Sequence, residues 1–206
     1  NVKTGDELEI GDSKLVFVEA SMLHWPDTMM TYMTGDNILF SNDVFGQHYA
    51  SEMLYDDMDD ISKLIHEAEK YYTNIITPFS TFVTKKLAEV QGMNLKIDLV
   101  APSHGVIWRE NIGLIMDLYA KWANNYQEDQ ITLIYDTMWQ STRKMAEAIA
   151  EGIQQASPNT TIKLLNVVKN DKNDILVEVF KSKAILVGSP TINNGFSYAI
   201  AGILEM

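Results

Sequence analysis

The sequence contains no cysteine and no long apolar run, and both absences narrow what it can be. Without cysteine among its 206 residues, the chain has no disulfide, no thiolate metal ligand and no thiol nucleophile. Any metal must therefore be held by nitrogen and oxygen atoms. No apolar run reaches about 18 residues, and no basic-then-apolar leader opens the chain, so neither a membrane span nor a secretion signal is indicated. We expect a soluble, cytoplasmic protein.

Basic side chains are also scarce, since 16 Lys and Arg stand against 28 Asp and Glu, a net charge of −12. Nucleic acids are bound by clustered basic side chains, so such a partner is disfavoured. Residues 1–122 hold most of the acidity, with 9 basic and 19 acidic side chains, whereas residues 123–206 hold 7 and 9. Part of this comes from the acidic run 56–60, interpreted as a solvated loop before a helix. The hydrophobic content of 46% can build one large or two small cores.

Three side chains that can bind metal each follow an apolar, strand-like segment. Asp43 comes after the run 38–40, and His24 and His104 come after similar segments. A carboxylate can place one oxygen on each of two metals, and two imidazoles can each bind one of them. The set therefore suits a dinuclear metal site.

The hydrophobic pattern predicts the elements that bring these residues together. Alternation predicts one hairpin over residues 7–20 and a second over 29–41. Helical spacing predicts helices over 58–77, 79–90 and 111–124, and a buried strand over 95–100 leads into His104. The polar interval that follows predicts a domain boundary, with domains over residues 1–124 and 125–206.

The second part opens with a strand and loop suited to a phosphate group. A buried strand over 131–135 is followed by the hydroxyl-rich loop 136–142 and a helix over 143–156. Free amides, hydroxyls and the helix dipole would all favour an anion there. An ordinary turn in which Ser and Thr cap the helix fits the same pattern. Walker and GxGxxG motifs are absent, so ATP and NAD are disfavoured.

These motifs resemble those of the flavodiiron proteins, also called rubredoxin:oxygen oxidoreductases or A-type flavoproteins. The matching segments are His24-Trp25-Pro26-Asp27, Ser41 to His48, Pro102-Ser103-His104-Gly105, Thr137 to Thr142 and Gly188 to Gly195. The resemblance implies an α/β protein, in which the C-terminal part of a metallo-β-lactamase-like αββα domain precedes the N-terminal part of a flavodoxin-like doubly wound parallel sheet. The family's His-x-Glu-x-Asp-His motif is missing, and only three of five expected flavodoxin strands are visible, near 131–135, 161–168 and 184–188. We therefore expect a central segment of a longer protein.

The resemblance also implies two cofactors, FMN and a pair of irons. FMN would lie against two loops, formed by Thr137, Met138, Trp139, Gln140, Ser141 and Thr142 and by Ser189, Pro190, Thr191, Ile192, Asn193, Asn194 and Gly195. The irons would be held by His24, Asp43 and His104, with Asp43 bridging them. Asp43 and Tyr71 are the candidate catalytic residues, Tyr71 because the resemblance implies a tyrosine close to the metal pocket.

The implied activity is the reduction of O2 to water or of NO to N2O, with electrons passing from FMN to the diiron centre. A small protein such as rubredoxin would supply them, and a head-to-tail homodimer or dimer of dimers is implied. Neither a nucleic acid nor a membrane is an expected partner. Two alternatives remain open. A zinc-dependent hydrolase of the same metal fold would leave the flavin loops unexplained, and an FMN electron-transfer module would leave the three metal-binding side chains unexplained.

Overall fold

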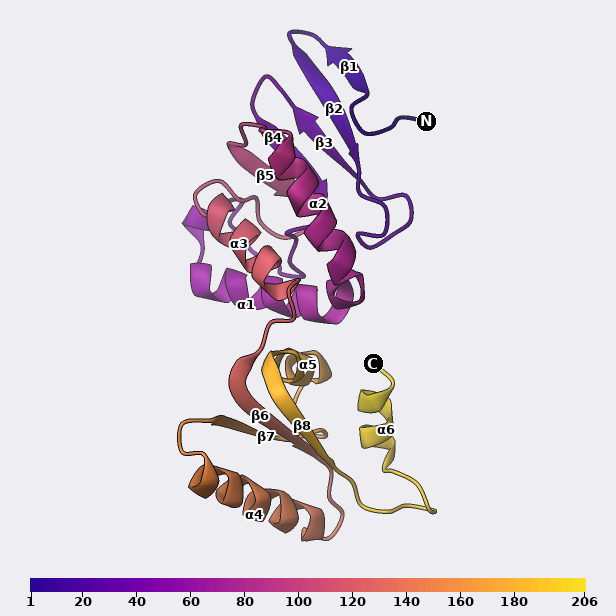
Figure 1. The fold of residues 1–206 in the computed structure, drawn as a ribbon, viewed down its shortest axis with the longest axis vertical. Helices are drawn as coiled ribbons and strands as arrows, with labels where there is room; N and C mark the ends of the chain where they lie inside the picture. Colours follow the sequence, from indigo (N-terminus) through magenta and orange to yellow (C-terminus); the bar gives the residue numbers. More distant parts are fainter. The chain divides into compact units, whose positions relative to one another are not determined.

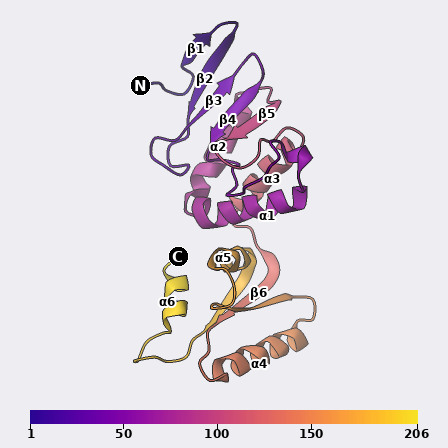
Figure 2. The ribbon, with the colours of Figure 1, turned by 180° about the vertical axis from the view of Figure 1, so that it is seen from behind.

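The computed structural model describes residues 1–206, which form two compact units, Asn1–Asn125 and Tyr126–Met206 (Figures 1 and 2). The division follows Asn125, one residue after the boundary that the sequence predicts. None of the helices combines the length and the apolar character that crossing a membrane requires.

The first unit contains a five-stranded sheet in the order β1-β2-β3-β4-β5 (Figure 1). The strands are β1 (Glu7–Ile10), β2 (Ser13–Glu19), β3 (Met29–Met33), β4 (Ile38–Asn42) and β5 (Leu99–Pro102). The first four pair antiparallel in chain order, and both predicted hairpins are present. Only β5 pairs parallel, against β4. Parallel pairing places the C-terminal ends of β4 and β5 side by side, and this positions the site.

The predicted strand over 95–100 is wrong in its first half, because only Leu99–Pro102 is strand. Before Leu99, the backbone finds partners at a corner of the sheet. The Lys96 carbonyl accepts from the Tyr32 hydroxyl at 2.7 Å, and the Asp98 amide donates to the Asn37 carbonyl at 2.9 Å. These groups are satisfied without a neighbouring strand.

Helix α1 (Ile61–Tyr71) begins at Asp60, whose carboxylate accepts from two first-turn amides. The sequence predicts a helix up to residue 77, but the regular helix ends at Tyr71. A π-helical turn (Tyr72–Ile76) and a 3-10 turn (Thr77–Phe79) connect it to α2 (Ser80–Gly92). The change precedes Pro78, which has no amide proton and whose ring crowds the carbonyl four residues earlier. Helix α3 (Ile112–Trp122) follows β5.

The acidic run is not simply a solvated loop. Asp56 begins a 3-10 helix (Asp56–Met58), and its side chain is only 1% exposed. Its carboxylate accepts from the backbone amides of Arg109, Glu110 and Asn111 and from the Asn111 side chain, at 2.8 to 3.3 Å. The sequence-based interpretation is therefore wrong for Asp56, because distant backbone donors surround this carboxylate in the fold.

The second unit is a three-stranded parallel sheet in the order β7-β6-β8. Its strands are β6 (Glu128–Tyr135), β7 (Thr161–Asn166) and β8 (Ser182–Gly188), and its helices are α4 (Ser141–Ala156), α5 (Lys172–Lys181) and α6 (Tyr198–Leu204). Leu133 packs with Ala146 of α4, whereas Ile134 packs with Ile175 of α5 and Ile200 of α6. Successive residues of β6 thus face opposite sides of the sheet, and helices cover both faces, as in a doubly wound fold.

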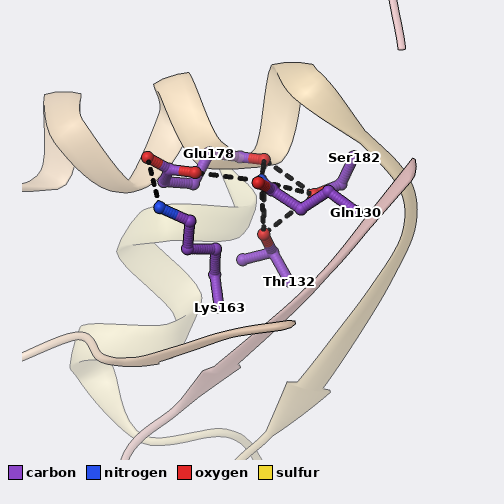
Figure 3. A network of polar contacts seen from close by, with 5 residues as sticks. All are labelled: Gln130, Thr132, Lys163, Glu178 and Ser182. Atoms are coloured by element: carbon purple, nitrogen blue, oxygen red, sulfur yellow. Dashed lines mark hydrogen bonds and ion pairs between the residues drawn. The ribbon is translucent and has the colours of Figure 1, made fainter. Parts of the chain in front are cut away.

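A polar network, buried except at Lys163 and Glu178, joins α5 to all three strands of this sheet (Figure 3). The Gln130 amide nitrogen lies 2.9 Å from the Glu178 carboxylate and 3.2 Å from the Ser182 hydroxyl. Thr132 and Ser182 share a hydrogen bond of 2.8 Å, and Lys163 of β7 lies 3.4 Å from Glu178. The network fixes α5 over β6 and β8.

Candidate functional site

The C-terminal ends of β4 and β5 present Asp43 and His104. Asn42 ties the two strands together beyond the last register pair. Its carbonyl accepts from the Ser103 amide, and its side-chain oxygen accepts from the Ser103 hydroxyl, both at 2.8 Å. The segment that follows β4 and the segment that follows β5 are therefore held next to one another, although Asn42 and Ser103 are 61 positions apart in the chain.

His24, Asp43 and His104 converge on one point of the first unit. His24 Nε2 lies 3.6 Å from Asp43 Oδ2, and His104 Nε2 lies 3.5 Å from Asp43 Oδ1. Each imidazole thus faces a different oxygen of the same carboxylate. All three side chains are partly accessible, with 17% to 31% of each side chain exposed. The structure brings the three predicted metal-binding residues together from the β2–β3 connection, the end of β4 and the end of β5.

A backbone hydrogen bond orients His104. Its Nδ1 lies 3.1 Å from the carbonyl oxygen of Gln47. A carbonyl can only accept, so Nδ1 donates the hydrogen bond and Nε2 is the ring nitrogen that faces Asp43. Partners of this kind, which fix the tautomer of a histidine, are typical of metal-binding imidazoles.

The loop after Asp43 folds tightly against His104. The Phe45 backbone is left-handed, at φ 68°. Its carbonyl oxygen accepts hydrogen bonds from the side-chain amide of Gln47 and from the Trp108 indole, both at 2.8 Å. A β-carbon on Gly46 would lie 2.7 Å from the His104 ring, so a larger residue there would displace the ring. Backbone in the left-handed region is costly for a large side chain and tends to occur at functional sites.

Tyr71 and His48 form an aromatic group around His104. The three ring centroids lie 4.8 to 5.0 Å apart. The Tyr71 side chain is buried, and its hydroxyl has no hydrogen-bond partner. Tyr71 ends α1, directly before the π-helical turn, a feature often found at functional sites. The predicted approach of Tyr71 to the pocket is therefore present in the structure.

His48 is the site residue that the sequence reasoning did not assign. It follows Asp43 by five residues in the same motif, and this proximity was the available signal. Burial and the neighbouring His104 lower the pKa of His48, whereas Asp43 acts in the opposite direction. Burial, followed by the Asp43 charge, raises the pKa of Tyr71 far above its ordinary value. The pocket thus holds a neutral phenol and favours a neutral imidazole at pH 7.

The three metal-binding side chains fit a pair of metal ions. Two ligand atoms about 2.1 Å from one metal lie roughly 3.0 to 3.4 Å apart, close to the two His–Asp distances. No group of three or more His, Cys, Asp or Glu side chains is placed to hold one metal ion together. The arrangement is instead two His–carboxylate pairs that share Asp43. Nitrogen and oxygen donors of this kind suit iron and zinc alike.

In the second unit, the loop between β6 and α4 has unused hydrogen-bond donors. The Thr137 hydroxyl is buried and has no partner. Gln140 precedes α4 in a left-handed conformation at φ 66°, and no side chain caps the helix. The first-turn amides of α4 thus lack a capping partner, so they and the Thr137 hydroxyl fit an anion such as a phosphate. A cavity of about 200 Å³ adjoins this loop, lined in part by Thr137, Gln140 and Arg143.

The second predicted flavin loop follows β8. Asn193 and Asn194 are both left-handed, and Ile192 and Gly195 exchange two backbone hydrogen bonds of 2.9 and 3.0 Å. This is the geometry of a tight turn, which favours asparagine. The Ser189 hydroxyl accepts from the Ser197 amide at 2.8 Å and so closes the loop. A cavity of about 530 Å³ lies along it, lined among others by Pro190, Thr191 and Gly195.

The two loops meet at the start of α4. A β-carbon on Gly188, at the end of β8, would lie 3.0 Å from the Thr142 methyl group. Met138 and Trp139 leave more than half of their side chains exposed, Trp139 as much as 84%. The exposed Trp139 does not support the loop by packing within this chain, so it is available to contact a bound ligand.

Comparison with known proteins gives matches over both units. A family model described as ODP family beta lactamase matches residues 2–105, and a Flavodoxin model matches residues 133–204. Anaerobic nitric oxide reductase flavorubredoxins from Enterobacter sp. (strain 638) and Salmonella typhi are each 57% identical over 205 residues. The match covers 99% of this chain and 42% and 43% of theirs, so the chain spans less than half the length of these relatives.

Solved structures show the same two-part match. The rubredoxin oxygen:oxidoreductase from Desulfovibrio gigas superposes with a TM-score of 0.94 at 32% identity, covering 99% of this chain and 51% of that one. The flavodiiron protein from Giardia intestinalis gives 0.91 at 33% identity, covering 99% and 49%. The metallo-β-lactamase-like fold and the flavodoxin-like fold thus occur here in the order that the sequence predicts.

Proposed function

The chain belongs to the flavodiiron protein family, and we propose that the protein passes electrons from FMN to a diiron centre that reduces a diatomic gas. The proposal is carried by the presence of two kinds of site in one chain. In the first unit, two imidazoles face the two oxygens of a single carboxylate, and in the second unit an uncapped, hydroxyl-bearing loop follows β6. The metal unit alone would suit a hydrolase, and the flavodoxin-like unit alone an electron carrier. Only a flavin-linked metal enzyme accounts for both.

In this proposal His24 and His104 would each hold one of two irons, and the Asp43 carboxylate would be a ligand to both. The irons, when bound, would relay electrons from FMN and offer open coordination positions to the gas. The protein orients His104 through the Gln47 carbonyl and keeps the Tyr71 phenol protonated beside it. Tyr71 can thus act as a hydrogen-bond donor in the pocket, which is why we place it among the catalytic residues.

FMN would be held by the two loops of the second unit. Thr137, Ser141 and Thr142 and the first amides of α4 would bind its phosphate, and residues 190–195 would lie beside the ring system. The orphaned Thr137 hydroxyl and the uncapped start of α4 support this placement. Met138, Trp139 and Gln140 would border the cofactor.

We propose NO as the preferred gas over O2. The support is a 57% identity to proteins named nitric oxide reductases, against 32% to one named for oxygen. The names of these relatives also favour a rubredoxin-type electron donor. Turnover of the full-length protein with each gas in turn, under anaerobic control, measures the preference directly.

Asp43→Ala tests the metal site. We expect about two irons per subunit in the full-length protein and loss of most of them in the variant, because a shared bridging ligand supports both ions. Asp27→Ala, which removes an exposed carboxylate from the same His24 motif, should keep the iron. Iron analysis and gas reduction are the measurements, and survival of both in Asp43→Ala would refute the proposal.

Counting ligands gives a second expectation for the same site. Two irons share about ten coordination positions, and three side chains fill too few of them. The three side chains alone leave most positions without a protein ligand, so the 206 residues by themselves should bind little iron. Tightly held, stoichiometric iron in that chain would contradict this assignment.

A further inference from the structure

An apolar cavity lies behind the metal-binding residues of the first unit. Its volume is about 40 Å³, and its walls come from β3, β4, α2, α3 and the loop after Asp43. The buried part of the wall is apolar throughout, formed by Leu23, Met30, Leu39, Val44, Phe45 and Val83, each no more than 2% exposed. No cluster of metal-binding side chains lines it, so the cavity is distinct from the site itself.

Two residues that line the cavity are chain neighbours of candidate metal-binding residues. Leu23 directly precedes His24, and Val44 directly follows Asp43. The outer end is lined by Gln91 of α2 and Asp117 of α3, both exposed, so the cavity opens to solvent between these two helices. The cavity thus has an opening between the two helices, and its lining includes the chain neighbours of two candidate metal-binding residues.

The size and lining of the cavity select its occupant. A single water needs roughly 10 to 15 Å³ on the same measure, together with two to four polar partners. The volume is several times larger, and the polar side chains that line it, Lys86, Gln91 and Asp117, belong to α2 and α3, so the side of the cavity formed by the sheet is apolar. Cavities of this kind stay dry and take up small apolar atoms or molecules. A diatomic gas fits both the space and the chemistry.

We propose that this cavity is a binding and access site for the diatomic gas on its way to the metal pair. The inference rests on the proposed function, because it assigns a route to that reaction's substrate. A low-polarity gas concentrates in an apolar cavity and is held close to where it reacts. The apolar side of the cavity formed by the sheet offers water and ions no polar partner.

Xenon tests the cavity without any turnover. Crystals of the full-length protein pressurised with xenon should show an anomalous peak between α2 and α3, beside Leu39 and Val83. Ala120→Phe, which places a ring in the cavity, should abolish the peak. Ala123→Phe is the matched control, because Ala123 is half-buried near the same helix end but does not line the cavity.

Gas kinetics test the access role. In full-length protein, Ala120→Phe should lower kcat/KM for the gas roughly fivefold or more, while kcat at saturating gas and the iron content stay unchanged. Ala123→Phe should leave all of these at wild-type values. Val83→Ala, which enlarges the cavity, should raise xenon occupancy without lowering kcat/KM. If Ala120→Phe does not fold, Met116→Phe fills the same cavity and takes its place.

The outcomes separate this inference from the proposed function. An active, iron-loaded protein without a xenon peak would overturn the cavity assignment alone. A xenon peak with unchanged kcat/KM in the filled variant would overturn the access role. A full-length protein that lacks iron and flavin would instead overturn the proposed function, and the access role with it, whatever the xenon result.

Discussion

The buried carboxylate of Asp56 holds together two segments that are far apart in the chain. Burial on its own would raise its pKa, but the hydrogen bonds from Arg109, Asn111 and Glu110 outweigh this and hold the pKa below its ordinary value. The ionised form is therefore bound more strongly in the folded state. These contacts join the segment before α1 to the segment before α3, close to the loop that leads from His104.

Asp56→Asn should destabilise the first unit by roughly 2 to 4 kcal/mol, because buried amide donors lose a charged acceptor. Since the folded pKa is depressed, the stabilisation is complete above the ordinary pKa of the carboxyl and disappears as the pH falls through the folded value. The wild-type and the variant should thus differ most at neutral pH and converge in acid. Urea unfolding at several pH values gives the comparison.

Asp57→Asn is the control for this prediction. Asp57 pairs with Arg109 at 2.8 Å on a more accessible surface, where solvent screens the pair, so its loss should destabilise the unit far less than the loss of Asp56. Equal effects of the two variants, or a difference at Asp56 that grows in acid, would contradict the account.

The phosphate loop offers a second prediction at the scale of single residues. Thr137→Val and the double variant Ser141→Ala, Thr142→Ala should each weaken FMN binding. Every charge-assisted hydrogen bond removed costs roughly 1.5 to 3 kcal/mol. Ser157→Ala, which removes a hydroxyl bonded to Thr160 at the far end of α4, should bind FMN as the wild-type does. Flavin fluorescence titration of the full-length apoprotein measures the FMN affinity of each variant. Unchanged affinity in both loop variants would rule out this placement.

At the scale of elements, the polar network of Figure 3 fixes one helix of the second unit. Thr132 is fully buried, and its hydroxyl lies 2.8 Å from Ser182 and 3.3 Å from the Glu178 carbonyl. The network joins β6, β8 and α5, so it sets how α5 lies on the sheet. Buried networks of this kind are stabilising only when each member has its partner.

Thr132→Val keeps the shape of the side chain but removes the hydroxyl. We expect a loss of roughly 1 to 3 kcal/mol in the unfolding free energy of the second unit, because Gln130 and Ser182 each lose a buried partner. Thr161→Val, at the exposed start of β7, is the matched control and should change stability by less than about 0.5 kcal/mol. Amide exchange of α5 should rise only in Thr132→Val, and unaltered protection there would contradict a positioning role.

At the scale of the whole molecule, the proposed cofactors belong to different units of the chain. FMN would bind to residues of the second unit and iron to residues of the first. We propose a head-to-tail homodimer in which the flavin of one subunit serves the irons of the other, a closed arrangement with twofold symmetry.

Mixing two inactive variants tests this directly. Full-length Asp43→Ala should lack a metal pair, and the Ser141→Ala, Thr142→Ala protein, whose weakened flavin is removed by dialysis before mixing, supplies subunits without FMN. After co-refolding in equal amounts, electron transfer between subunits should restore about a quarter of the wild-type rate, because half of the dimers are mixed and each holds one intact pair. Transfer within a subunit would restore no activity. A fully active monomer in analytical ultracentrifugation would also exclude the dimer.

Periodicity in the sequence predicted both hairpins of the first unit and the three parallel strands of the second. The fold of each unit and the residues proposed for the two cofactors were implied by short motifs that resemble those of a known family. The turns at residues 72–79 and the shortened β5 were not predicted, because the local hydrogen-bond geometry depends on Pro78 and on partners such as Tyr32 and Asn37.

Only the tertiary structure decided how distant side chains meet. It placed His24 and His104 on opposite oxygens of Asp43, added His48 to the site, buried Asp56 and opened the apolar cavity beside Leu23 and Val44. Each of these depends on contacts between segments far apart in the chain, mostly through the parallel pairing of β4 with β5 and the packing of α2 and α3. Sequence patterns report which face a residue prefers, but the neighbour it meets there is set by the packing of the whole unit.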